Sequence, residues 1–159
     1  LDVGNGSETP MTCSITISPM VLSEAGLPIQ SMDSTRSCSA WTSVEPGSFT
    51  LDPKAIQTIS LSIAVPSDAS GGYYCLVLVD AKPVKNEKEI FPDSGVTSSI
   101  NFSYRSSAVV LLVVPKGRLA SSLVPSDLKF EKNLKSGYYD MHLPVKNNGN
   151  VHARIRGIV

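Results

Sequence analysis

Hydrophobic and polar residues alternate along several short segments of this chain. In Met11–Ile17 every odd position is apolar and every even position carries a hydroxyl group. Ile56–Val65 is a second strand-like segment, which alternates through Ile59, Leu61, Ile63 and Val65. A period of two places alternate side chains on opposite faces of a strand, whereas an amphipathic helix shows a period of about 3.6. The pattern predicts strands with one buried face, and no segment has convincing helical periodicity.

Two longer apolar runs predict more deeply buried strands. Tyr73–Val79 is apolar at nearly every position, which is typical of a central strand, and Ser106–Val114 is rich in valine. Shorter strands are expected at Phe49–Leu51, Ser99–Arg105, Leu123–Phe130, Tyr138–Val145 and Val151–Val159. Strands spaced about ten residues apart with Gly/Pro turns predict an all-β, antiparallel sandwich.

The end of the chain repeats its beginning. Leu1-Asp2-Val3-Gly4-Asn5-Gly6 returns as Leu143-Pro144-Val145-Lys146-Asn147-Asn148-Gly149, and Pro115-Lys116-Gly117 lies between the copies as a domain boundary. Ser122–Glu131 precedes the second copy and has no counterpart before the first. We therefore expect a tandem array, with residues 1–115 forming one domain that lacks its first strand and residues 116–159 forming the first strands of a second, incomplete domain.

Three cysteines, Cys13, Cys38 and Cys75, leave at least one thiol unpaired, and their wide spacing fits no zinc or Cys-x-x-Cys motif. Cys13 and Cys75 lie in apolar, strand-like stretches, which favours buried free thiols. A disulfide between two of the three, for example one that includes Cys38, is the alternative in an oxidising compartment. The sequence does not decide the pairing.

Three segments resemble the immunoglobulin-like domains of bacterial proteins related to the pilus chaperones (PapD-like). They are Arg36–Pro46, which contains Trp41, then Phe49–Leu51, and then Val65–Tyr74. Tyr104-Arg105 and Asn147–His152 are similar to tandem cell-surface proteins that accompany WxL domains. The resemblance implies an immunoglobulin-like antiparallel β-sandwich, followed by the opening strands of a second similar domain, in an exported protein of the periplasm or cell surface.

The resemblance also implies structural roles for two aromatic residues. Trp41 lies in the segment that matches the family's core motif, so we expect it to pack in the core. Tyr74 follows a Gly turn at the start of a late strand, which is the position of a tyrosine corner. Chaperone activity is not implied, because the second domain stops early, no anchoring basic pair can be placed, and Ser106–Val114 is apolar on both faces.

The composition and the absence of known motifs argue against several classes of function. The chain is 42% hydrophobic and 18% charged, with 14 basic and 14 acidic residues, so nothing predicts binding to nucleic acid or insertion into a membrane. The longest apolar run, Ala108–Val114, is too short to span a bilayer. His142 and His152 have no metal-binding spacing, and no hydrolase elbow or phosphate loop is present. We expect no enzyme, no metal and no cofactor.

The sequence therefore predicts a non-catalytic structural or adhesive module of an exported bacterial surface or periplasmic protein, part of a tandem immunoglobulin-like array. One alternative is a module for strand exchange (β-augmentation), or a chaperone-like module, because an open strand edge accepts another strand. The candidate donor residues are Leu123, Val124, Leu128 and Phe130. A second alternative is a carbohydrate-binding module, in which Trp41 stacks on sugars. The expected partners are other protein domains or copies of this chain, and a cell-wall glycan under the second alternative.

Overall fold

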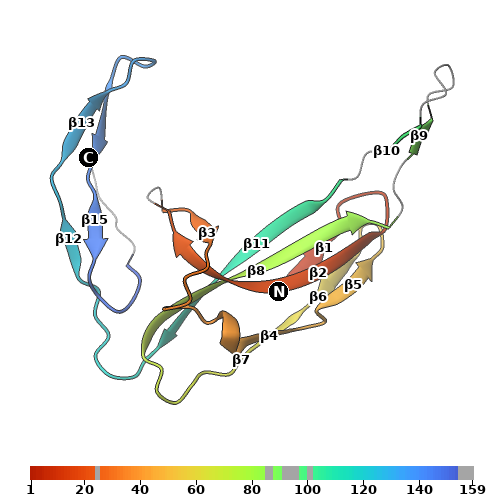
Figure 1. The fold of residues 1–159 in the computed structure, drawn as a ribbon, viewed down its shortest axis with the longest axis horizontal. Coiled ribbons are helices and arrows are strands. Elements are labelled where there is room, and N and C mark those ends of the chain that lie inside the picture. The colour runs from red at the N-terminus through yellow and green to blue at the C-terminus, as the bar shows by residue number, and fades with distance from the viewer. Residues whose placement is uncertain (24–25, 85–87, 91–96, 100–101, 154–159) are drawn as a thin grey trace. The chain divides into compact units, whose positions relative to one another are not determined.

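The computed structural model describes residues 1–23, 26–84, 88–90, 97–99 and 102–153, and these residues form strands and one short 3-10 helix (Figure 1). The predicted all-β class is confirmed. Most of the segment expected as a strand at Val151–Val159, and the middle of the one at Ser99–Arg105, lie outside the described residues. The elements are β1 (Asp2–Gly4), β2 (Met11–Leu22), β3 (Pro28–Gln30), η1 (Ser39–Trp41), β4 (Thr42–Glu45), β5 (Ser48–Leu51), β6 (Ile56–Thr58), β7 (Ser60–Ile63), β8 (Gly71–Pro83), β9 (Lys88–Ile90), β10 (Thr97–Ser99), β11 (Tyr104–Val114), β12 (Leu123–Pro125), β13 (Lys129–Lys132), β14 (Tyr139–His142) and β15 (Val145–Asn147).

The largest sheet is built around β2, and its strand order is β11-β8-β2-β3. β2 runs antiparallel to β8 from Met11, opposite Pro83, to Pro19, opposite Cys75, and its first residues also pair with β5. The odd positions of β2 from Met11 to Ile15 are buried and the even positions are exposed, as the alternation predicts. Cys75–Leu78 in β8 are buried at every position, which confirms its central place.

A second layer consists of two antiparallel pairs, β1 with β6 and β4 with β7. Only Ile59 separates β6 from β7, and its side chain is 1% exposed. Ile59 meets Ile15 and Val77 of the large sheet in one core cluster. The two layers thus form an antiparallel sandwich, with β1, β6/β7 and β4 facing β3, β2, β8 and β11. This is the strand arrangement of an immunoglobulin-like domain.

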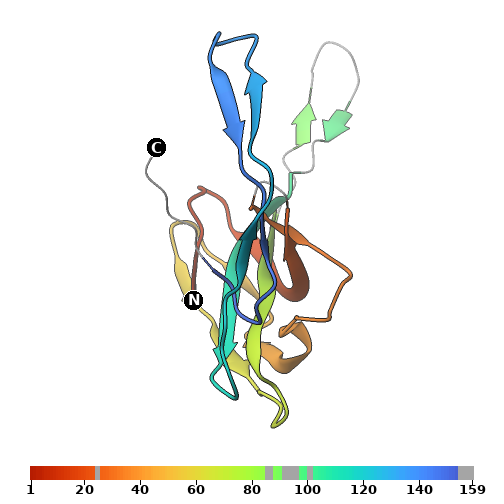
Figure 2. The same ribbon diagram turned by 90° about the vertical axis from the view of Figure 1, so that its left-hand side faces the viewer.

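The chain divides into two compact units. The first unit comprises Leu1–Ser67 with Tyr74–Leu111, and the second comprises Asp68–Tyr73 with Leu112–Val159. In the second unit β12 pairs with β15 and β13 pairs with β14, so the four strands form one long antiparallel ribbon (Figure 2). None of the described residues from 112 to 153 is buried. The described part of this ribbon therefore has no core of its own.

Candidate functional site

Several strands of the first unit pair with one neighbour alone among the described residues, and β1 and β11 are two of them. β1 pairs only with β6, and β11 pairs only with β8. Val3 of β1 and both Ala108 and Val110 of β11 pack against the same core cluster. Val3 of β1 and Tyr104 of β11 also line one pocket, so the two strands border the same side of the sandwich, which we call the open side.

Alternate residues of β11 point inward and outward. From Ala108 onward, half-buried positions alternate with exposed ones. The exposed positions include Val109, Leu111 and Val113, which are 42%, 42% and 37% exposed. The expected unbroken apolar run thus consists of one row that packs in the core and one row, Val109, Leu111 and Val113, that faces outward. An outward apolar row on an edge strand is a surface that a partner can cover.

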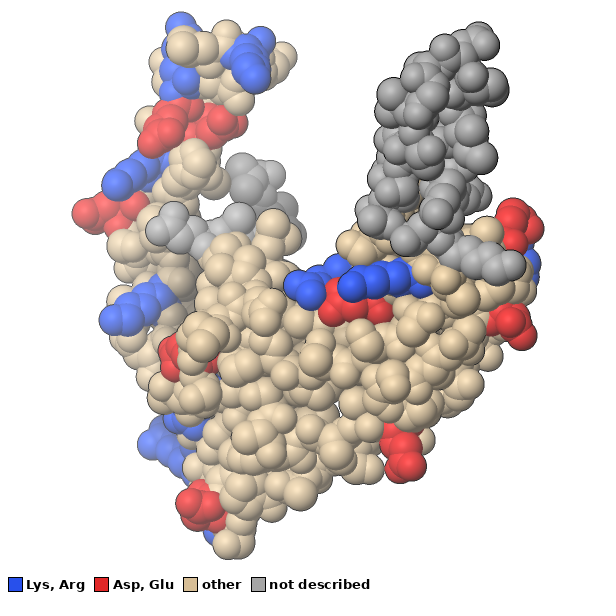
Figure 3. Space-filling model, turned by 45° about the vertical axis from the view of Figure 1, so that its right-hand side comes forward, with Lys and Arg blue, Asp and Glu red and all other residues tan. Residues whose placement is uncertain are grey.

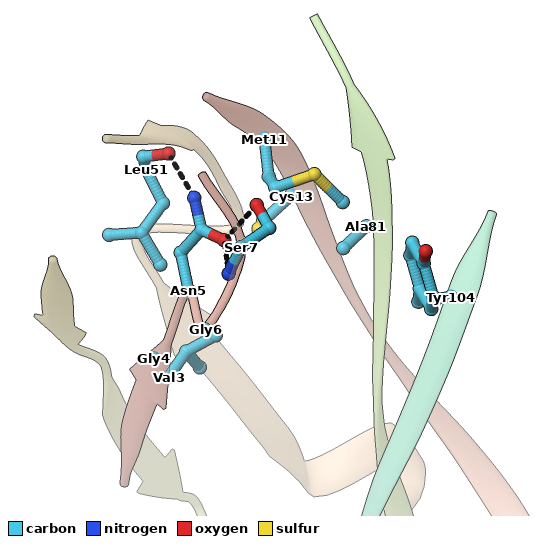
Figure 4. A pocket seen from close by; sticks show the side chains of 10 residues that line it. All are labelled: Val3, Gly4, Asn5, Gly6, Ser7, Met11, Cys13, Leu51, Ala81 and Tyr104. Atoms are coloured by element: carbon cyan, nitrogen blue, oxygen red, sulfur yellow. Dashed lines mark hydrogen bonds between the residues drawn. The ribbon is translucent and has the colours of Figure 1, made fainter. Parts of the chain in front are cut away.

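A pocket of about 340 Å³ opens on the same side of the first unit (Figure 4). Its wall is mostly apolar and comes from β1 and the turn after it, from β2, β5 and β8, and from the start of β11. Tyr104 stands at its rim with 60% of its surface exposed. The lining residues are Val3, Gly4, Asn5, Gly6, Ser7, Met11, Cys13, Leu51, Ala81 and Tyr104. We call it the edge pocket.

Asn5 is the buried polar residue of the edge pocket, and its hydrogen bonds are made within the protein. Its Nδ2 donates to the carbonyl oxygens of Thr9, Leu51 and Asp52 at 2.9, 3.0 and 3.1 Å. Its Oδ1 accepts from the backbone N–H and the hydroxyl of Ser7 at 3.0 and 2.7 Å. Asn5 therefore holds the turn together, and the edge pocket mainly offers apolar surface to a ligand.

The start of β11 is held to β8 by an ion pair. Arg105 donates to both carboxylate oxygens of Asp80, from Nε at 2.7 Å and from Nη2 at 3.0 Å. These hydrogen bonds lower the pKa of the Asp80 carboxyl group and raise the pKa of Arg105. In Figure 3 the broad tan part of the surface carries few charged side chains, whereas the narrow part carries many.

All three cysteines are buried, and two of them meet. The Sγ atoms of Cys38 and Cys75 lie 3.0 Å apart, and neither residue is exposed to solvent. Burial raises the pKa of Cys38 to about 12, and the neighbouring Cys75 adds to the shift. Cys13 packs elsewhere, with Met11 and Leu51, and burial raises its pKa as well. Sequence reasoning could not single out this pair, because 37 positions separate Cys38 from Cys75.

The two aromatic candidates are both half-buried. Trp41 ends η1, and its carbonyl oxygen accepts the N–H of Ala64 at 2.9 Å. Tyr74 packs against the cluster of Met20, Leu76 and Leu78.

The neighbour of Tyr74 has the contact expected of a tyrosine corner. The hydroxyl of Tyr73 accepts the N–H of Ser70, in the turn before β8, at 3.3 Å. Both tyrosines follow the same Gly turn, so the sequence could not show which ring faces that turn.

The four candidate donor residues belong to the ribbon of the second unit. Leu123, Val124, Leu128 and Phe130 are 41%, 48%, 45% and 62% exposed. Leu123 and Val124 pair with Asn147 and Lys146, and Phe130 pairs with Met141. Their backbone is therefore paired on one side within their own unit, while their apolar side chains remain accessible.

Two further features bear on chemistry. Within the described residues, no three His, Cys, Asp or Glu side chains come together as a metal site. In the same part of the chain, we find no helix with the length and apolarity needed to cross a membrane.

Comparison with known proteins gives one structural likeness to report. No protein-family profile and no curated protein matches the chain. A solved chain from a study of a chaperone–tip adhesin complex in CFA/I fimbriae biogenesis is similar over 94% of this chain, with 19% sequence identity and a TM-score of 0.43. This chain spans 59% of the length of that solved chain. The likeness to WxL-associated proteins stays a prediction from sequence.

Proposed function

We propose that this chain is a non-catalytic protein-interaction module whose open side receives an extended segment by strand pairing. The observation that carries the proposal is the coincidence of three features on one side of the first unit. These are the free edge of β1, the free edge of β11 and the apolar edge pocket between them. The proposal combines two hypotheses from the sequence: the chain is a structural module, and it binds its protein partner by strand exchange.

A strand added at the open side would pair with the backbone groups of its edge strands. An edge strand presents N–H and C=O groups that a new strand pairs with, and alternate side chains of the incoming strand provide specificity. The outward side chains of Val109 and Leu111, which belong to the first unit, would be shielded from water by such a partner. Because the polar atoms of Asn5 are already bonded, the edge pocket suits an apolar side chain better than a polar one.

The partner we propose is a second copy of this chain, which would donate the segment Leu123–Phe130. That segment has four exposed apolar residues, Leu123, Val124, Leu128 and Phe130, and their burial in an apolar groove would be favourable. Exchange of one element between identical chains is a common route to assembly. Assembly of this kind fits an exported tandem array at the periplasm or cell surface, which we propose on the sequence resemblance. A glycan platform has less support, because Trp41 is half-buried.

The test is self-association of the whole chain, measured by analytical ultracentrifugation over a range of concentrations. We expect the wild type to associate, and Leu111→Lys to weaken association roughly tenfold or more, since a buried unpaired ammonium group is unfavourable. Ser60→Lys adds the same charge at an exposed position of β7 and is expected to leave association unchanged. A synthetic peptide of residues 123–130 should compete with association, whereas a scrambled peptide should not.

Two results would overturn the proposal. One is a wild type that stays monomeric at every concentration and does not bind the peptide. The other is an equal loss of association in Leu111→Lys and Ser60→Lys, which would show that added charge acts without regard to the open side.

A further inference from the structure

We infer that Cys38 and Cys75 are a disulfide-forming pair, joined when the chain folds in an oxidising compartment, and that Cys13 remains a thiol. The inference goes beyond the proposed function and does not depend on it. Of the three possible pairings, the structure brings together only these two sulfur atoms, 3.0 Å apart, and both residues are completely buried.

The backbone places the two cysteines side by side. Ser37 and Tyr74 form an isolated parallel bridge, and each cysteine is the next residue along its segment. The N–H of Cys38 donates to the carbonyl oxygen of Tyr74 at 3.3 Å, and the N–H of Tyr74 donates to that of Arg36 at 2.8 Å. Because two paired segments run in the same direction here, both side chains leave the backbone from matching positions. A disulfide of about 2.0 Å therefore needs a small movement of the side chains.

The link would attach a long connection to the centre of the sandwich. Cys38 immediately precedes η1, on the connection between β3 and β4, whereas Cys75 lies in the buried part of β8. A cross-link between residues 37 positions apart restricts the unfolded chain, and it also holds the residue before η1 against β8. The expected result is a more stable first unit.

The chemistry balances with a disulfide oxidant such as glutathione disulfide. The thiolate of one cysteine attacks a sulfur of the oxidant, forms a mixed disulfide and releases one glutathione thiolate. The thiolate of the second cysteine then attacks the protein sulfur, closes the Cys38–Cys75 bond and releases the second glutathione. Two protons leave the cysteines and are taken up by the two glutathione thiolates, and two electrons pass to the oxidant.

Burial decides when this exchange occurs. In the folded protein neither sulfur is exposed, and the raised pKa of Cys38 keeps that thiol protonated and unreactive. Exchange must therefore take place during folding, before Cys38 and Cys75 are buried. Cys13 is buried in a different cluster and has neither other cysteine beside it, so it has no partner with which to form a bond in the native arrangement.

The experiment is to unfold and reduce the whole chain, refold it with reduced and oxidised glutathione, and alkylate it in denaturant before intact-mass measurement. We expect one alkylated cysteine in the wild type and three after reduction. Peptide mapping should place the link between Cys38 and Cys75. Reduction should lower the Tm by on the order of 10 °C.

Two variants serve as controls. Cys13→Ser removes the spectator thiol and should show the same link and the same fall in Tm on reduction. Cys38→Ala removes one partner, so its Tm should not respond to reduction. The inference is overturned if the refolded wild type has three alkylated cysteines, if Cys13 takes part in the link, or if a glutathione adduct persists on Cys38 or Cys75. Unchanged Tm values of wild type and Cys13→Ser on reduction would overturn the stabilising role.

Discussion

Asn5 in the first unit and Asn147 in the second close the same turn. In each case Oδ1 accepts the N–H of the residue two positions later, from Ser7 at 3.0 Å and from Gly149 at 2.9 Å. In each case Nδ2 donates to the carbonyl oxygen four positions later, to Thr9 at 2.9 Å and to Val151 at 2.7 Å. The sequence repeat is therefore also a repeat of local structure.

The two turns differ in what surrounds them. Asn5 is 7% exposed, and its Nδ2 also donates to the carbonyl oxygens of Leu51 and Asp52, at the end of β5 and just after it. Asn147 is exposed, and its Oδ1 also accepts the N–H of Ser122, which precedes β12. The first turn is thus covered by a segment that follows it in the chain, and the second contacts a segment that precedes it.

The third position of the turn shows a further difference. A Cβ atom at Gly149 would overlap the carbonyl oxygen of Ala120 and would lie 2.7 Å from the Cα of Ser121. The matching residue in the first unit is Ser7, whose hydroxyl donates to the carbonyl oxygen of Thr9 at 2.8 Å. Residues 120–122 pass very close to Gly149. A segment that came equally close to position 7 would collide with the side chain of Ser7. The comparison teaches that the two copies share a turn but differ in how closely a neighbouring segment can pass its third position.

The largest loss of stability is expected from a substitution of the buried Asn5. Asn5→Ala removes every hydrogen bond of the Asn5 side chain, including the buried one to the carbonyl oxygen of Leu51, so we expect a loss of unfolding free energy of about 3 kcal/mol. Asn147→Ala, where water replaces the lost bonds, should cost about 1 kcal/mol or less. Urea unfolding followed by the fluorescence of Trp41, in the first unit, measures the first effect. Equal losses in the two variants would mean that burial does not distinguish the turns.

The next effect concerns the close approach in the second unit. Gly149→Ala introduces a methyl group that the backbone of 120–122 must move to accommodate. We expect the bonds from Asn148 N–H to Ser122 O and from Asn150 N–H to Ala120 O to weaken. Hydrogen exchange at these two amides should speed up by roughly tenfold or more, which corresponds to about 1.4 kcal/mol. Gly6→Ala is the matched control, since a Cβ there would have open space. Unchanged exchange in Gly149→Ala would show that the contact is not tight in solution.

Much of the first unit could be predicted from the sequence, because burial there follows residue type. The alternation of Met11–Ile17 and the unbroken apolar run of Tyr73–Val79 identify an amphipathic strand and a central strand. The run Ser106–Val114 was harder to interpret. Residues of the same apolar types lie on both faces of this edge strand, although one face packs in the core and the other is exposed.

The candidate site was less accessible to sequence reasoning, because it depends on contacts between distant segments. The sulfur atoms of Cys38 and Cys75 lie close together because Ser37 and Tyr74 form a bridge. No local sequence pattern predicts this bridge. The edge pocket needs Tyr104 and the turn at Asn5 to line the same space. The repeated Asn-Gly turn was the one local signal that pointed to Asn5.

The smallest effect is expected from a change that makes the first turn resemble the second. Ser7→Gly places at position 7 the residue type found at Gly149. It removes the hydroxyl that donates to Asn5 Oδ1 and Thr9 O, but it keeps the backbone N–H that Oδ1 accepts. Loss of an exposed hydroxyl and the added freedom of glycine should together cost about 1 kcal/mol, measured by the same urea unfolding. Both turns share the bonds of the asparagine side chain to the N–H two positions later and to the carbonyl oxygen four positions later. A cost close to that of Asn5→Ala would instead place the stability of the first turn in the hydroxyl of Ser7, which the second turn lacks.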